Sequence, residues 1–138
     1  MTPVALLAMY VNFNGQDLHD YGRQATLVLD RTALDSTTWT SAGWTANTGG
    51  LRAGTLALES LDDFTDNLFD EIMWNAFMST SGIVPFTIRP MQDPVGVSNP
   101  SYSGNVLVTG HSVGGAINTL AGKSLSFPLS GAVARAVA

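Results

Sequence analysis

The sequence predicts a mainly β protein: two packed antiparallel sheets, sandwich-like or barrel-like, with one flanking α-helix. Short apolar segments separated by Gly, Asn, Pro and Ser recur along most of the chain, as in sandwiches and barrels. Residues 66–78 break this rhythm with apolar residues at helical spacing. Residues 32–50 break it as a polar stretch, which predicts a long projecting loop or hairpin arm. No linker divides the chain, so we expect one domain over residues 1–138.

The chain begins with an apolar segment that we interpret as a buried strand. Residues 1–11 lack the basic start of a signal peptide, and Asn12 interrupts them well before the roughly 20 residues of a membrane span. Apolar and polar side chains alternate over residues 9–13, as in a half-buried strand. Asn14 and Gly15 follow, and Asn-Gly is the strongest short signal for a hairpin turn.

Further strands follow the hairpin. Residues 23–30 alternate with a period of two, which places Ala25, Leu27 and Leu29 on the face toward the core. Strand-like segments recur at residues 54–60, 82–90, 103–110, 122–130 and 132–137. Their number and spacing favour antiparallel sheets over alternating strands and helices.

The predicted helix has an apolar side and an acidic start. Its apolar residues form two adjacent rows, Leu68, Ile72 and Ala76 beside Phe69, Met73 and Phe77. Thr65 is the expected N-cap, and acidic residues early in the helix complement its dipole. We therefore expect the helix to lie on a sheet with Asp66, Asp70 and Glu71 toward solvent.

The composition limits the function classes. The chain is 45% hydrophobic and only 12% charged, so much of its surface must be Ser, Thr, Asn and Gly, as in many proteins that assemble. A net charge of −5 argues against a surface that binds nucleic acid, because such a surface needs clustered Lys and Arg. An acidic surface can still face DNA, since it repels the polymer and lets it move. The absence of cysteine excludes disulfide and thiolate chemistry.

One motif suggests a serine hydrolase. Residues 110–114, Gly-His-Ser-Val-Gly, match the GxSxG pattern of a nucleophile elbow. A hydrolase of that class places its acid and histidine after the serine, yet no His, Asp or Glu follows Ser112. Only His111 and His19 exist, and neither is placed to complete the triad. We instead interpret residues 105–113 as a strand entering a Gly-Gly turn, and we expect no catalytic residues and no enzymatic activity.

Two acidic segments could suggest a cation site. The run that contains Asp62, Asp63 and Asp66 lacks the glycine and the terminal glutamate of a calcium loop, so helix-dipole complementation explains it better. Residues 17–20, Asp-Leu-His-Asp, offer too few ligands at useful spacing and resemble a solvated turn. We expect neither a metal nor a cofactor.

The three tryptophans are the candidate contact residues. Trp39 and Trp44 lie in the polar stretch of residues 32–50, where aromatic side chains serve as anchors of protein interfaces. The alternative is that the arm folds back and both rings cover the domain's own core. Trp74 lies beside the apolar rows of the helix, and it either widens the buried face or meets a partner.

Three blocks of the sequence carry a resemblance to a known family. Residues 11–30 contain an Asn-Gly-x-Asp-Leu hairpin before a long strand, and residues 49–64 contain a Gly-Leu-basic turn into a strand. Residues 99–137 combine Asn-Pro-Ser-Tyr, a Leu-Val strand, a Gly-Gly crossover and an Ala-Arg-Ala end. Together these blocks resemble the tail tube proteins, or major tail proteins, of long-tailed, non-contractile bacteriophages.

The resemblance implies a structural function in a virion. Members form six-fold rings that stack into a tube around a tape measure protein, and DNA passes through the lumen without specific binding. It implies synthesis in the host bacterial cytoplasm, location in the virion tail, and no membrane partner. The arm of residues 32–50 would then reach the adjacent ring, with Trp39 and Trp44 as inter-ring contacts. A tail terminator or head-to-tail joining protein forming a single ring, or a monomeric β-sandwich binding module, is the alternative.

Overall fold

A computed structural model describes residues 9–18, 22–61, 69–114, 116–120 and 122–138. Its described residues form two antiparallel sheets and one α-helix, which confirms the predicted mainly β fold with a flanking helix. The two sheets are separate and open, so the barrel-like alternative is not observed. The N-terminal strand before residue 9, the N-cap at Thr65 and the Asp-His-Asp turn beyond Leu18 fall outside the described residues.

The larger sheet has five strands in the order β2-β1-β5-β6-β8. These strands are β1 (Tyr10–Phe13), β2 (Gln16–Asp17), β5 (Ile83–Arg89), β6 (Ser101–Leu107) and β8 (Ala134–Ala136). Asn14 and Gly15 join β1 to β2 with φ angles of 53° and 81°, the left-handed conformation that a two-residue hairpin turn requires. The predicted Asn-Gly turn is therefore confirmed.

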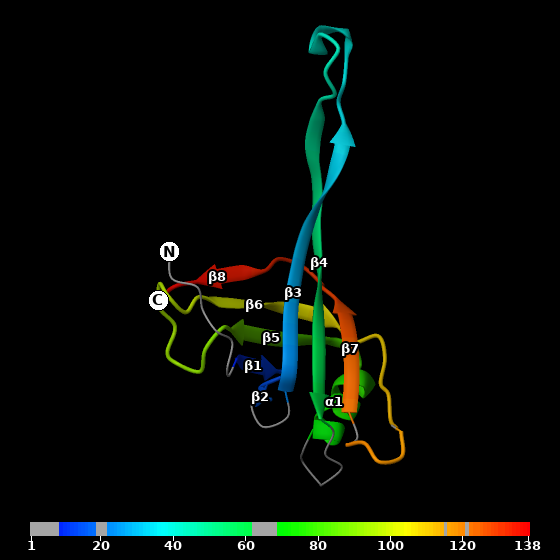
Figure 1. Ribbon diagram of the computed structural model, residues 1–138, viewed down its shortest axis with the longest axis vertical. Helices are drawn as coiled ribbons and strands as arrows, with labels where there is room; N and C mark the ends of the chain where they lie inside the picture. Colours follow the sequence, from blue (N-terminus) through cyan, green and yellow to red (C-terminus); the bar gives the residue numbers. More distant parts are fainter. Residues whose placement is uncertain (1–8, 19–21, 62–68, 115, 121) are drawn as a thin grey trace.

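The smaller sheet contains β3 (Gly22–Asp35), β4 (Asn47–Leu61) and β7 (Gly122–Pro128), in the order β3-β4-β7. β3 and β4 pair from Gly22 opposite Ser60 to Asp35 opposite Asn47, and they project from the body as one long hairpin (Figure 1). The predicted arm of residues 32–50 is thus the outer end of this longer hairpin: residues 36–46 form its loop, and β3 and β4 supply the residues on either side.

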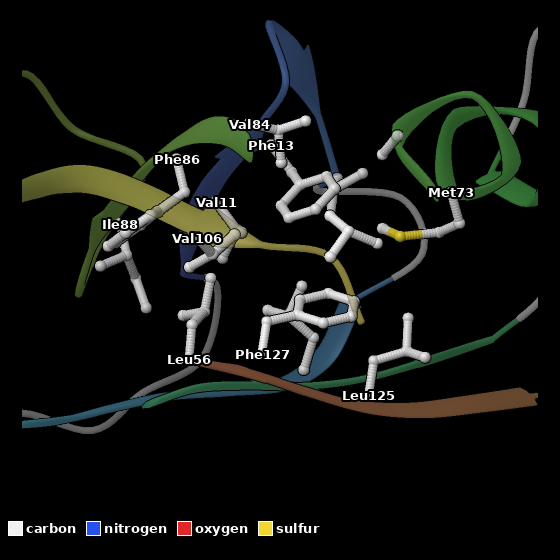
Figure 2. Close-up of a cluster of buried hydrophobic side chains, with 14 of the residues drawn as sticks. Val11, Phe13, Leu56, Met73, Val84, Phe86, Ile88, Val106, Leu125 and Phe127 are labelled. Atoms are coloured by element: carbon white, nitrogen blue, oxygen red, sulfur yellow. The ribbon is translucent and has the colours of Figure 1, made fainter. Parts of the chain in front are cut away.

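The core lies between the two sheets and the helix. Figure 2 shows Leu56, Leu125 and Phe127 of the smaller sheet facing side chains of β1, β5 and β6. The rings of Phe13 and Phe127 stack across the interface with centroids 5.8 Å apart, and both side chains are buried. Aromatic stacking adds to the hydrophobic gain from burying both rings, so this pair joins the two sheets.

The helix α1 (Phe69–Met78) closes one end of the core. Phe69, Met73 and Ala76 of the predicted apolar rows are buried, and Met73 points into the core in Figure 2. Phe77, which was predicted in the same rows, is 38% exposed, Ile72 is half-buried, and Leu68 lies outside the described residues. Asp70 and Glu71 are half-buried instead of facing solvent as predicted, and Asp70 lies beside His111 of the segment after β6. Within the described residues, no helix has the length and apolar character needed to cross a membrane.

Two predicted strands differ from the structure in extent or exposure. Leu29 was expected in the core with Ala25 and Leu27, but it is 52% exposed. The reason is that Leu29 pairs with Gly54, which comes before Leu56, the first buried hydrophobic residue of β4. Leu29 therefore lies where the hairpin has already left the core. The prediction holds for Ala25 and Leu27, which pack against the core.

The predicted strand over residues 105–113 is wrong beyond Leu107, where β6 ends. Leu107 pairs with Ile83, the first residue of β5, and Val108 N–H then donates to the Gly82 carbonyl at 2.7 Å. Gly82 has a φ of 70° and begins the turn back toward α1, so β5 offers β6 no further partner. A strand without a neighbour leaves its backbone groups unpaired, which ends the ladder here.

Candidate assembly surface

β3 presents a long edge for pairing with another chain. It is the outer strand of its sheet, and within the described part of the molecule only β4 pairs with it. Its side chains are mostly exposed, and they include the apolar Val28, Leu29 and Leu34, each about half exposed. An unpaired edge of this length is a template for strand addition, and proteins that remain monomeric usually cover it.

Hydrogen bonds hold the base of the arm's loop. The Thr37 backbone N–H donates to Asp35 Oδ1 at 2.9 Å, and the Ala46 N–H donates to Thr37 Oγ1 at 2.8 Å. The Ser36 N–H donates to the Ala46 carbonyl at 2.9 Å. Hydrogen bonds from the Thr37 side chain and backbone N–H lower the pKa of Asp35 from its ordinary value of 3.8. The loop therefore has a defined shape.

The end of the loop is a short 3-10 helix, η1 (Trp39–Ser41). Thr38 N–H donates to Ser41 Oγ at 3.1 Å, and Trp44 N–H donates to the Ser41 carbonyl at 3.0 Å. Ala42 and Gly43 reverse the chain with φ angles of 55° and 84°. Gly43 carries no steric penalty in this left-handed conformation, whereas the Cβ of Ala42 does.

Trp39 and Trp44 are presented to solvent at this end of the arm. The exposed fractions are 103% for Trp39 and 78% for Trp44, and the arm does not fold back onto the body (Figure 1). The structure thus excludes the alternative in which both rings cover their own core. Burying an exposed tryptophan is strongly favourable, so two of them on a projecting hairpin are suited to contact a partner. That contact itself remains a prediction.

A second exposed apolar surface lies on α1. Trp74, Phe77 and Met78 are 47%, 38% and 59% exposed, and we call these three residues the helix patch. The His111 ring lies beside it, with centroids 5.5 Å from Trp74 and 6.5 Å from Phe77. His111 Nε2 lies 3.5 Å from Asp70 Oδ1, so the segment after β6 lies against the start of the helix. Trp74 therefore has intramolecular neighbours but keeps a free face.

The GxSxG motif does not form a nucleophile elbow. Such an elbow needs the serine on a sharp turn between a strand and a helix. In the structure β6 ends five residues before Ser112, no regular helix follows it among the described residues, and Ser112 is exposed. No group of three or more potential ligands is placed to hold a metal among the residues that the structure describes. His19, Asp20, Asp62, Asp63 and Asp66 lie outside that part.

Comparison with known proteins was made by sequence and by fold. No protein-family model matches the sequence, and no curated protein matches it. One similar structure is a chain from the virion of a native gene transfer agent particle, with a TM-score of 0.73 and 18% identity over 94% of this chain and 95% of that one. The two chains share a fold. Another is a chain from the tail of an empty gene transfer agent particle refined with helical and C6 symmetry, with a TM-score of 0.70 and 19% identity over 93% of each chain.

The likeness to tail proteins that the sequence shows is therefore confirmed at the level of the fold. It extends over nearly the whole length of both chains. The sequence singled out Trp39 and Trp44 as candidate contact residues, and their contacts stay a prediction. It did not indicate the exposed face of Phe77 and Met78 or the contact between His111 and Asp70. Residue spacing gave no signal for that contact, because it joins segments about forty residues apart.

Proposed function

We propose that this chain is a structural protein of a virion tail, in which six copies form a ring and the rings stack into a tube. The observation that carries the proposal is the shared fold, over 93% of both chains, with a chain from a gene transfer agent tail of C6 symmetry. The chain would be synthesised in the cytoplasm of the host bacterium. It would act by assembly and would make or break no covalent bond.

Ring closure would use the edges of the three-stranded sheet. β3 and β7 are the two outer strands of that sheet, and the ring brings an edge of one copy next to a different edge of its neighbour. Such a heterologous contact closes when the rotation between copies divides a full turn. Joining the sheets edge to edge forms a closed barrel, which removes the exposed edge of β3.

Stacking of the rings would use the projecting arm. Trp39 and Trp44 lie at the end of an arm that projects beyond the body, and both are exposed, so a neighbouring ring would bury them (Figure 1). The monomeric binding module that we considered as an alternative would keep its arm folded on itself, so the extended arm favours assembly. A tail terminator or head-to-tail joining protein differs in forming one ring that does not stack.

The charge of the chain suits a passage for DNA. Eleven acidic and six basic residues give each copy a net charge of −5. An acidic lumen repels phosphate, so a tube that surrounds a tape measure protein would also conduct DNA without binding it. We place no individual residue in the lumen.

Size-exclusion chromatography with light scattering, over a concentration series, tests the proposal together with negative-stain electron microscopy of the largest fraction. Stacked rings or hollow tubes are the expected result. Single rings that never stack at any concentration would favour the terminator or joining protein. A monomer that also fails to enter tubes when mixed with tail tubes from its own virion would contradict the proposal.

A further inference from the structure

We infer that the arm tip, defined as Trp39 and Trp44 with the loop that carries them, docks on the helix patch of a second copy in the next ring. The inference rests on the proposed stacking of rings and adds the receiving surface. Trp74, Phe77 and Met78 would form that surface.

The positions of the two surfaces support this pairing. Figure 1 shows the arm tip at one end of the molecule's long axis and α1 near the other end. When identical subunits stack along this axis, the tip of one copy advances toward the helix end of the next. Because the two surfaces differ, a docked pair keeps one free tip and one free helix patch, and the contact repeats without limit.

The chemistry of the two surfaces also matches. Residues 36–51, which contain the whole tip, carry no charged side chain, and Trp39 and Trp44 are its exposed anchors. The helix patch presents two aromatic rings and a methionine, and each of these side chains is more than a third exposed. Aromatic pairs and contacts between sulfur and aromatic rings are favourable beyond the area that they bury.

Both surfaces are already ordered in the single chain. The bonds of Thr37 to Ala46 and of Thr38 to Ser41 fix the backbone of the loop, so docking orders mainly the side chains of the exposed Trp39 and Trp44. On the other side, the ring contacts of His111 fix Trp74 and Phe77. Preorganised surfaces lose less conformational entropy on association. Each single contact buries a small surface, but six of them form together between two rings, so their binding energies reinforce one another.

Disulfide cross-linking between single-cysteine variants tests the inference, because the natural chain contains no cysteine. Thr40→Cys labels the tip, and Asn75→Cys labels the exposed side of α1 next to Trp74. The two variants are mixed, assembled and oxidised. Val97→Cys replaces Asn75→Cys in the control, since Val97 is exposed on a different loop.

The expected result is a cross-linked pair with a yield about tenfold or more above the control, because apposed thiols have a high effective concentration. Stacked rings with equal yields from both mixtures would overturn the docking and leave the tube proposal standing. If no mixture forms an oligomer at all, the proposed function fails and the docking fails with it.

A second comparison uses truncated side chains. Trp39→Ala with Trp44→Ala, and separately Trp74→Ala, are expected to abolish stacking of rings while the rings themselves still form. Val97→Ala is the matched control and is expected to stack normally. Normal tubes from a correctly folded Trp74→Ala variant would contradict the docking.

Discussion

At the scale of single residues, the stacked rings of Phe13 and Phe127 join the two sheets. Both side chains are buried, and they come from different sheets, so each removes one face of the other from water. Residues of this kind determine the stability of the subunit, whereas the exposed tryptophans do not. Changes at the two kinds of position should therefore have separable effects.

Phe127→Ala is expected to lower the free energy of unfolding by about 3–5 kcal/mol, because it removes a buried ring and leaves a cavity between the sheets. Urea unfolding followed by circular dichroism measures this loss. The exposed Trp39→Ala change is the control and should shift the free energy by less than about 0.5 kcal/mol. Equal effects of the two changes would show that Phe127 is not a core residue.

Asp35 makes the shape of the loop depend on pH. Its pKa is below 3.8 in the folded chain because of hydrogen bonds from Thr37, so the carboxylate stabilises the loop above the unfolded pKa. That contribution is lost as the pH falls through the lower, folded pKa. Nuclear magnetic resonance titration should give Asp35 a pKa below 3.8 and, in Thr37→Ala, a value closer to 3.8. An unchanged pKa in the variant would contradict the assigned cause.

At the scale of elements, the sequence predicts features that depend on neighbours along the chain. The Asn14-Gly15 turn, the alternation of Ala25 and Leu27 and the apolar face of α1 are all local patterns, and the structure confirms them. The end of β6 at Leu107 depends instead on where β5 begins to turn away. No pattern in residues 105–113 carries that information.

The arm is expected to be dispensable for folding and required for stacking. Replacing residues 35–47 by Asn-Gly would close the hairpin on the pair Leu34 and Thr48 with a two-residue turn. No core residue lies in the removed segment, so the unfolding midpoint should change little. Light scattering should then detect rings but no stacks. Tubes formed by the shortened chain would contradict the stacking role of the arm.

At the scale of the whole molecule, the fold class could be predicted because short alternating strands and one amphipathic helix leave few other architectures. Of the two surfaces proposed for assembly, the sequence indicated the arm tip but not the helix patch. Exposed tryptophans in a polar arm are visible in the sequence, but the free face of the helix patch depends on how the segment of His111 packs beside α1. Contacts between distant segments are decided by the folded core and not by local spacing.

The central claim is that this chain assembles with six-fold symmetry, and the mass of its smallest closed assembly tests that claim most directly. Native mass spectrometry of the assembled protein should give a species with six times the 14.5 kDa mass of the chain, and multiples of it. End-on averages in electron microscopy should show the same symmetry. A closed assembly with a different number of copies, or a chain that stays monomeric at every concentration and beside its own virion tails, would contradict the account.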